Sequence, residues 1–334
     1  MIILDNIISS LQTTGGVTIY FDNIKDRLLR DKKEVEILNF ADVNNTNSRM
    51  MQIEPRFLER YRDCRVSFNY NSGIFHSSYY RIPNNKNLKV ITTVHDFTYE
   101  IFVKGLKQKV HTWQKNRAIR NSNKIICVSN NTAQDLQRFC NVSDDKIEII
   151  NNGVSDNYFP LPERLDTNNV IFVGARGGYK NFTLAVQSLA MRSQFNLVIV
   201  GGGALTTSEM EMLNHYLPGR YDFRGRLTDD DLNIVYNNAF CLLYPSSYEG
   251  FGIPVIEAMR AGCPVVAINS SSIPEVAGDA ALLLDKADKN NILEALDVIL
   301  YERKKLIDRG FEQAKKFSWE KCYQETVSVY NKLS

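Results

Sequence analysis

The sequence YPSSYEGFGIPVIEAMRAGCPVVAINSSSIPEVAGD, residues 244–279, decides the fold, because it joins two strand patterns through a glycine-containing loop and a short helix pattern. An apolar run ends at Pro245, residues 253–261 have helical composition, and a second apolar run, PVVAIN, follows at 264–269. Such alternation predicts an α/β protein with a parallel sheet. Ligands bind beyond the carboxyl ends of the strands in these sheets, so the loop 249–252 is a candidate site.

Two carboxylates and two glycines mark this segment. Glu249 lies in the loop and Glu257 follows eight residues later on the helix, so one carboxylate can reach the head of a ligand while the other holds its far end. Gly250 and Gly252 allow the backbone to come close, and the helix N-terminus suits a phosphate. Taken alone, each glutamate fits an ordinary position better, as a first-turn acid or a solvated helix residue. The combination favours a ligand site.

The run EGFGIPVIE at 249–257 resembles the Glu-x7-Glu signature of retaining GT4-type glycosyltransferases, which have the GT-B fold. The resemblance implies two Rossmann-like, doubly wound α/β domains that face each other across a cleft. It also implies that Glu249 holds the hydroxyls of the donor sugar and Glu257 the ribose hydroxyls. The donor diphosphate is then expected near the amides of Gly250, Phe251 and Gly252.

Length and composition fit a protein of two domains. The 334 residues, of which 44% are hydrophobic, leave room for two cores, and the net charge of +2 gives no indication of nucleic acid. Six scattered cysteines without a C-x-x-C pair indicate buried free thiols in a reducing compartment. Asp5 interrupts the apolar N-terminus, which argues against a signal peptide, and no apolar run is long enough to span a bilayer. We therefore expect a cytoplasmic protein, at the inner face of the cytoplasmic membrane if its acceptor lies there.

The first half of the chain alternates apolar runs with helical stretches, which predicts a doubly wound parallel sheet. Its expected strands are Ile2–Asn6, Val35–Asn39, Val66–Tyr70, Lys89–Val94 and Lys124–Val128. Residues 41–65 fit a loop that leads into a helix. With a linker that contains Pro160 and Pro162, the expected domains are 1–155 for the acceptor and 156–316 for the nucleotide sugar. By the resemblance, the helix 317–334 returns to the first domain.

Two places in the first domain are candidates for the site. Gly15 and Gly16 stand before a helix pattern, where a plain turn is the simpler interpretation, but the resemblance implies that they face the donor phosphates. His95 directly follows the apolar run KVITTV, at a strand end. A lone histidine is more often structural. The resemblance nevertheless implies that His95 contacts the transferred sugar and that Asp96 lies on the acceptor side.

The three remaining histidines and a basic segment have different expected positions. The resemblance places His76, in FHSSYY, in an acceptor-side loop, whereas His111 and His215 are expected on helix surfaces. Residues 104–124 are rich in Lys and Arg and contain no acid. A solvated helix face and a contact with anionic lipid or an acceptor phosphate both fit this segment.

The second domain opens with VIFVGARGGYKNF at 170–182. Arg176 and Lys180 lie there in a glycine-rich loop after a strand, where two cations can neutralise a diphosphate without a metal, although a solvated turn fits the pattern equally well. The resemblance implies that both bind the donor pyrophosphate, and that the stretch 221–227 binds the base through residues Arg224, Gly225 and Leu227.

No cofactor or metal is expected. The run LVIVGGGA at 197–204 is not a G-x-G-x-x-G fingerprint, so a nicotinamide cofactor is not predicted. Thr228 followed by Asp229, Asp230 and Asp231 suits a capped helix start better than a metal-binding Asp-x-Asp.

The function that follows from the resemblance is a retaining glycosyltransferase, with His95, Arg176, Lys180 and Glu249 as its catalytic residues. It would move a hexose from a nucleotide diphosphate sugar to a hydroxyl of a glycan or lipid-linked acceptor in surface-polysaccharide synthesis. The run VGARGGYKNF resembles mannosyltransferases, which favours mannose from GDP-mannose. A noncatalytic subunit that binds nucleotide sugar and another GT-B enzyme, such as a sugar epimerase, are the alternatives.

Overall fold

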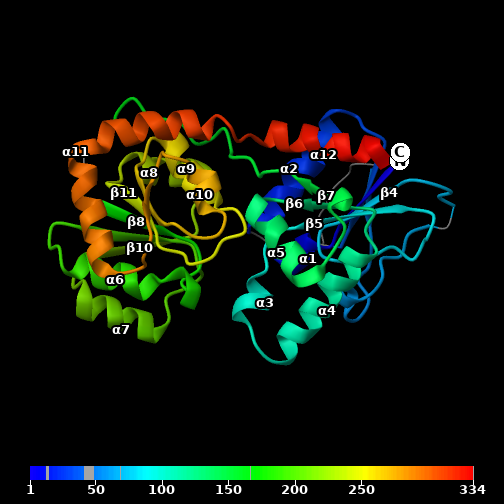
Figure 1. Cartoon of the computed structure of the whole chain (residues 1–334), viewed down its shortest axis with the longest axis horizontal. Coiled ribbons are helices and arrows are strands. Elements are labelled where there is room, and N and C mark those ends of the chain that lie inside the picture. Colours follow the sequence, from blue (N-terminus) through cyan, green and yellow to red (C-terminus); the bar gives the residue numbers. More distant parts are fainter. Residues whose placement is uncertain (13–14, 41–48, 68, 166, 334) are drawn as a thin grey trace. The chain divides into compact units, whose positions relative to one another are not determined.

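The computed structural model describes residues 1–12, 15–40, 49–67, 69–165 and 167–333. The chain forms two compact units, drawn in Figure 1. The first contains Met1–Asn152 and Trp319–Ser334, and the second contains Gly153–Ser318. The sequence placed the corresponding boundaries after residues 155 and 316.

The first unit is built on a parallel sheet whose strand order is β3-β2-β1-β4-β5-β6-β7. Its strands are β1 (Ile2–Asn6), β2 (Val35–Asn39), β3 (Met50–Gln52), β4 (Ile74–Ser77), β5 (Lys89–Val94), β6 (Lys124–Cys127) and β7 (Ile147–Ile149). The order reverses between β1 and β4, as in a doubly wound sheet. The predicted strand at 66–70 is wrong: its described residues form no strand, and the strand lies at Ile74–Ser77 instead.

The helices of the first unit follow the strands in the doubly wound pattern. They are α1 (Ile8–Leu11), α2 (Gly16–Arg30), α3 (Thr98–Phe102), α4 (Leu106–Arg120), α5 (Asn130–Cys140) and α12 (Trp319–Leu333), with 3-10 turns η1 (Glu59–Tyr61) and η2 (Asp144–Lys146). Helix α12 packs on α2, where Glu320 pairs with Arg27 and Arg30, and Lys332 near its end pairs with Glu148. These contacts make α12 part of the first unit.

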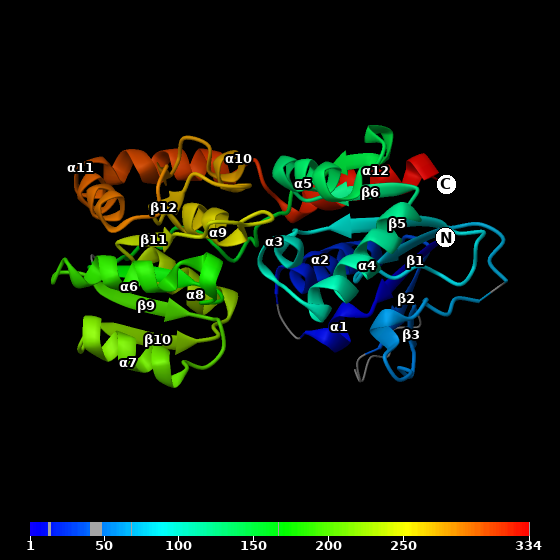
Figure 2. The same ribbon diagram turned by 60° about the horizontal axis from the view of Figure 1, so that its bottom comes forward.

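The second unit has a parallel sheet in the order β10-β9-β8-β11-β12-β13. Its strands are β8 (Asn169–Val173), β9 (Asn196–Val200), β10 (Tyr221–Gly225), β11 (Cys241–Tyr244), β12 (Val265–Ile268) and β13 (Leu282–Leu284). Its helices are η3 (Gly178–Lys180), α6 (Phe182–Ala190), α7 (Thr207–Tyr216), α8 (Asp229–Asn237), α9 (Ile253–Ala261), α10 (Ile273–Ala277) and α11 (Lys289–Ala314). Figure 2 shows the strands of each unit with helices packed against them.

Strands with helices on both faces are buried on both sides, which explains their continuous apolar runs. In the second unit the residues of β8, β9 and β11 form one core with α6 and α11. The reversal of strand order between β8 and β11 places two loops side by side at the carboxyl edge of the sheet, one before α6 and one before α9. This edge is where the candidate site is found.

Candidate functional site

Lys180 and Glu249 form an ion pair at the carboxyl edge of the second sheet. Lys180 ends η3, which follows β8, and Glu249 lies in the loop between β11 and α9. Each side chain is only 12% exposed. The Lys180 Nζ also lies 5.3 Å from the ring centre of Tyr179 and 5.5 Å from that of Tyr244. The two predicted donor-binding charges are therefore in direct contact, in a partly desolvated setting that strengthens their electrostatics.

Hydrogen bonds fix the loop after β8 and the loop after β11 relative to each other. The Ser247 amide donates to the Tyr179 carbonyl at 2.8 Å, and the Asn181 side chain donates to the Pro245 carbonyl at 2.8 Å. From the loop after β12, Ser271 Oγ accepts from the Glu249 amide, and Ser272 Oγ donates to the Glu249 carbonyl. Glu249 is thus placed by its backbone before any ligand contacts its carboxylate.

Gly252 shapes the start of α9. Its φ of +103° lies in the region that favours glycine, and a Cβ at this position would approach Ile273 Cδ1 to 2.7 Å. Only glycine fits here, and α9 begins at the same edge as Lys180 and Glu249, although Pro254 in its first turn has no amide hydrogen. Gly250 and Phe251 precede it in this loop, with Phe251 buried. The loop can therefore receive an anion at a helix N-terminus.

Glu257 lies buried on α9 among phenol groups. Tyr236 donates to its Oε2 at 3.2 Å, and Tyr158 interacts with it while donating to Asp229 Oδ1 at 3.2 Å. Burial, reinforced by the charge of Asp229, raises the pKa of Glu257 to about 7, against the hydrogen bonds from the two tyrosines. Glu257 is therefore a carboxyl group that titrates near neutral pH and can accept bonds from ligand hydroxyls.

Arg176 is occupied by protein groups in this structure. Its Nε donates to Glu209 at 2.9 Å, and its two terminal nitrogens donate to the carbonyls of Gly201, Gly203 and Ala204. The guanidinium thereby holds the glycine turn after β9. The diphosphate contact predicted for Arg176 would require it to give up these bonds, as Lys180 would have to give up its pair with Glu249.

The predicted base-binding residues lie at β10 and the loop after it. Arg224 is exposed and pairs with Asp222 at 2.6 Å, the Gly225 carbonyl accepts from the Gly201 amide, and Leu227 is half-buried. Thr228 Oγ1 accepts from the Asp231 amide, which confirms the predicted capped start of α8. Because Asp229 follows directly and faces Tyr158, this loop borders the Glu257 site.

In the first unit, His95 and Asp96 follow β5 at its carboxyl end. The His95 ring lies edge-on to Tyr20 of α2, with ring centres 5.1 Å apart, and its Nε2 is buried without a hydrogen-bond partner among the described residues. Burial, with a contribution from Lys115 and against the effect of Asp96, lowers the pKa of His95 to about 4, so its imidazole is neutral. Asp96 Oδ1 accepts from the Thr98 amide at the start of α3.

The predicted glycine pair stands at the start of α2. Gly15 has a φ of +150° and Gly16 begins the helix, so the free amides of its first turn lie here. Residues 13–14, which precede the pair, lie outside the described part of the chain. Since Tyr20 of the same helix contacts the His95 ring, the start of α2 and the end of β5 share one edge of the first sheet.

Two histidine predictions are corrected by the structure. His76 is fully buried, and its ring nitrogens bond Tyr330 at 2.7 Å and Thr93 at 2.8 Å, so it is a core residue with no free group for an acceptor. Burial and the neighbouring His95 lower the pKa of His76 to about 3. His111 is also buried, stacked on Tyr99 at 3.9 Å, rather than on a helix surface, whereas His215 is exposed as expected.

The basic segment 104–124 divides into two parts. Lys115 is buried, Arg117 pairs with Asp63, and Lys124 pairs with Glu148, so these cations are neutralised within the unit. The exposed cations are Lys104, Lys107, Lys109 and Arg120. The segment as a whole is therefore neither a solvated helix face nor a surface free to bind anionic lipid or an acceptor phosphate, and only its exposed cations fit either interpretation.

Sequence reasoning missed the residues that support the site. Tyr158 lies in the linker, Tyr236 is one of many apolar positions of α8, and Ser271 and Ser272 belong to a serine run after β12. Only the serine run, which follows a strand at the functional edge, gave a signal that could have been used.

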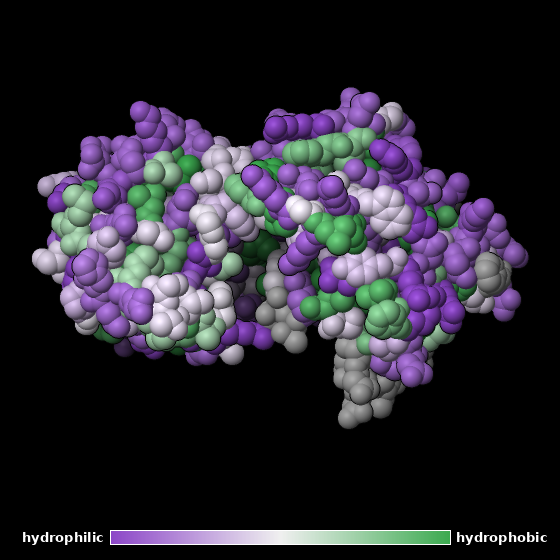
Figure 3. All heavy atoms as spheres, turned by 90° about the horizontal axis from the view of Figure 1, so that it is seen from below, coloured by the Kyte–Doolittle hydropathy of each residue, from purple (hydrophilic) through white to green (hydrophobic). Residues whose placement is uncertain are grey.

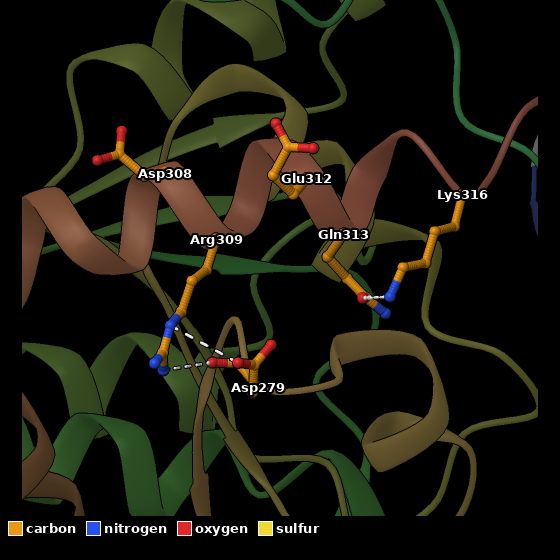
Figure 4. A pocket seen from close by; sticks show the side chains of 6 residues that line it. All are labelled: Asp279, Asp308, Arg309, Glu312, Gln313 and Lys316. Carbon is orange, nitrogen blue, oxygen red and sulfur yellow. Dashed lines mark hydrogen bonds and ion pairs between the residues drawn. The ribbon is translucent and has the colours of Figure 1, made fainter.

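A hollow of about 370 Å³ on the second unit carries no comparable chemistry. Figure 4 shows it against α11, where Arg309 pairs with Asp279 and Lys316 bonds Gln313. The Gln313 amide also donates to the Val276 carbonyl. Both cations that line the hollow already bond neighbouring side chains, so it is a weaker candidate for a ligand site than the Lys180–Glu249 pair.

Among the described residues, no group of three or more His, Cys, Asp or Glu side chains could hold a metal ion. No helix in this part of the chain has the length and the apolar composition that a membrane span requires.

Comparisons with known proteins identify related families and relatives. The family described as "Glycosyl transferases group 1" matches residues 155–317, and "Glycosyltransferase Family 4" matches residues 14–158. O-antigen chain mannosyltransferase B of Escherichia coli is 28% identical over 305 residues, which cover 83% of this chain and 79% of the relative. O-antigen chain mannosyltransferase RfbU of Salmonella typhimurium is 27% identical over 268 residues, which cover 78% of this chain and 75% of the relative.

Solved structures share the fold. Sucrose-phosphate synthase from Thermosynechococcus elongatus matches with a TM-score of 0.81 and 19% identity, over 99% of this chain and 98% of that one. Anabaena Alr3699/HepE, solved with UDP and glucose, matches with a TM-score of 0.74 and 14% identity, over 99% of both chains. At these identities the matches bear on fold alone.

Proposed function

Because the chain belongs to the GT4-type glycosyltransferases and has the GT-B fold, we propose that it transfers a hexose from a nucleotide diphosphate sugar to a hydroxyl, with retention of anomeric configuration. The observation that carries the proposal is the Lys180–Glu249 pair, which stands where two parallel strands of the second sheet end beside a helix N-terminus. A diphosphate with a sugar attached to it matches a cation and a carboxylate that are held together beside the start of a helix.

The proposed roles follow from the chemistry of each group. Lys180 exchanges Glu249 for the diphosphate of the donor and neutralises the charge that develops as the sugar departs. The released Glu249 carboxylate accepts bonds from the sugar hydroxyls. Glu257 accepts bonds from the ribose hydroxyls, and neutral His95 offers the sugar a ring nitrogen.

The bond changes balance without a covalent enzyme intermediate. The bond between the anomeric carbon and the phosphate oxygen breaks, the acceptor oxygen bonds to the same face of that carbon, and the acceptor proton passes to the departing phosphate. No described residue at either sheet edge is needed as a nucleophile in this scheme.

We propose mannose from GDP-mannose as the donor and a growing surface polysaccharide as the acceptor. The names of the two bacterial relatives, both O-antigen chain mannosyltransferases, support this choice. The sequence VGARGGYKNF, in which Lys180 lies, resembles mannosyltransferases and supports it independently.

The first test is the thermal unfolding of the protein with GDP, UDP or dTDP and with their sugars, in the absence of metal. A ligand at 100 times its Kd stabilises the folded state by about 2.7 kcal/mol, which raises Tm by several degrees. We expect the largest shift with GDP or GDP-mannose. A melting curve that none of these nucleotides changes would contradict the proposed function.

We further propose that the acceptor is reached at an anionic membrane, through a surface we call the α3–α4 face. Its exposed apolar residues are Ile101, Phe102, Leu106, Val110 and Trp113. Lys104, Lys107 and Lys109 are exposed among them. Figure 3 shows apolar and hydrophilic atoms intermingled on the side of the first unit that carries these helices. Apolar side chains beside cations suit the headgroup region of an anionic bilayer.

Leu106 tests this contact, because it is 76% exposed and touches the bilayer only if the α3–α4 face binds. Burial of one leucine side chain contributes about 1.5–3 kcal/mol, so a Leu106→Ser variant should bind phosphatidylglycerol vesicles about tenfold more weakly in a sedimentation assay. Leu165→Ser, at a leucine 70% exposed in the second unit, is the matched control. Equal binding by the two variants and the parent protein would rule out the α3–α4 face.

A further inference from the structure

Lys115 is a fully buried lysine next to the His95–Asp96 turn. Its exposed fraction is 0%, although it belongs to the most basic segment of the chain. Its Nζ donates to the backbone carbonyl of Asp96 at 2.8 Å and to Glu100 Oε2 at 2.8 Å. It also lies 4.1 Å from the ring centre of Phe97. Every one of these partners lies within the six residues that follow β5.

A buried ammonium is costly unless its partners are well placed. The Glu100 side chain is also buried. Its carboxylate accepts hydrogen bonds from Lys115 and from the Thr112 hydroxyl at 3.1 Å, and the ring of His111 lies beside it. Burial opposes ionisation of Glu100, but the neighbouring His111 ring and the charge of Lys115, which donates to the carboxylate, outweigh it and lower the pKa of Glu100 to about 2. The pair is thus a fixed anchor between α3 and α4.

The anchor acts on the chain segment that carries His95. The Asp96 carbonyl is the first backbone acceptor after His95, so the Lys115 bond fixes the direction in which the chain leaves β5. Tyr80, which follows β4, packs its ring 5.5 Å from the same Nζ. Lys115 therefore ties the carboxyl ends of two neighbouring strands to α4.

We propose that Lys115 is a positioning residue, which holds the His95–Asp96 turn in the geometry needed for sugar transfer. The effect on turnover rests on the proposed function, whereas the effect on His95 itself does not. A purely apolar residue of similar size would fill the same space but leave the Asp96 carbonyl without its donor. Retention of a buried ion pair where a hydrophobic residue could stand fits a role in local geometry rather than in stability.

The charge of Lys115 also affects His95. Five titratable groups lie near His95. They are Tyr20 of α2, His76 of β4, Tyr80 after β4, Asp96 after β5 and Lys115 of α4. Burial is the main cause that lowers the pKa of His95, Lys115 lowers it further, and Asp96 opposes both. Removal of the ammonium is therefore expected to raise the pKa of His95.

The experiment compares Lys115→Met, the double variant Lys115→Met with Glu100→Gln, and Lys86→Met as a control at an exposed lysine in the loop before β5. The single variant leaves the buried Glu100 carboxylate without its cation. The double variant removes both buried charges and therefore leaves no unpaired charge in the interior. The chain has four histidines, and the His95 signals can be assigned by comparison with a His95→Asn variant. Histidine NMR titrations are recorded for each protein, together with kcat and donor KM.

We expect Lys115→Met to show a raised His95 pKa and both Lys115 variants to show a kcat reduced about tenfold or more, since small misplacements of a catalytic group have effects of this size. Donor KM should change little, because the proposed nucleotide-binding groups lie in the second unit, and Lys86→Met should match the parent protein. An unchanged His95 titration in the Lys115→Met variant would overturn the inference, whether or not transfer is detected. If the parent protein transfers no sugar, the proposed function fails, and the titration still decides the role of Lys115.

Discussion

A Lys180→Met variant is expected to lose sugar transfer almost completely, with kcat lower by about 100- to 1000-fold, because it removes a preorganised positive charge from the departing diphosphate. Lys180 is placed for this by three neighbours: Glu249 pairs with its ammonium, and the rings of Tyr179 and Tyr244 enclose it. Steady-state rates with a labelled nucleotide sugar measure the effect. Donor KM should rise less than kcat falls, since Glu257 still holds the nucleotide in the proposed site.

The control for this experiment is Lys304→Met. Lys304 lies exposed on α11 of the same unit, so its loss changes the net charge equally without touching the loops after β8 and β11. Parent-like kcat is expected for it. If Lys180→Met also kept the parent kcat, Lys180 would have no part in leaving-group stabilisation and the assignment would be wrong.

The contact between Lys180 and Glu249 shows what the sequence could predict. Each residue stands in a glycine-containing loop directly after an apolar strand, and parallel strands put such loops on one edge. Spacing along the chain therefore identified both residues as candidates, although 69 positions separate them. The same argument placed His95 and Asp96 correctly at the end of β5.

Arg176 shows what position in a loop leaves open. It follows a strand and lies between glycines, as Lys180 does, but its guanidinium turns toward the carbonyls of Gly201, Gly203 and Ala204. Those acceptors come from the turn after β9, so the direction of the side chain depends on a neighbour 25 or more residues away. A pattern within one loop contains no information about it.

The predictions for His76 and His111 were wrong for a related reason. His76 and His111 are buried by partners from α12, β5 and α3, which meet them only in the folded unit. Tyr158 and Tyr236 were missed because phenol groups in a linker and on a helix are unremarkable until Glu257 is seen between them. Sequence patterns located the strand ends, whereas tertiary contacts decided which side chains are free there.

The raised pKa of Glu257 should affect both the pH dependence of folding stability and the pH dependence of nucleotide binding. Its pKa is raised from an ordinary value to about 7, so the folded protein holds a proton there that the unfolded chain has already released. The contribution to stability is fully present below the ordinary glutamate pKa and is lost as the pH rises toward 7. Ribose hydroxyls, by contrast, bond best to the ionised form, so nucleotide binding should strengthen as the pH rises through 7.

A Glu257→Gln variant separates these effects. It is expected to bind nucleoside diphosphate about 30-fold or more weakly at pH 8, because charge-assisted hydrogen bonds of about 1.5–3 kcal/mol each are lost, and the remaining binding should not change between pH 6 and 8. Without ligand, the same variant should melt at a higher temperature than the parent protein at pH 8, because no buried carboxylate has to ionise. Calorimetric titration and thermal unfolding at both pH values measure the two quantities, with Glu294→Gln on the exposed face of α11 as the control. Weaker binding together with higher stability cannot arise from misfolding, and a parent-like affinity at pH 8 would remove Glu257 from the ribose site.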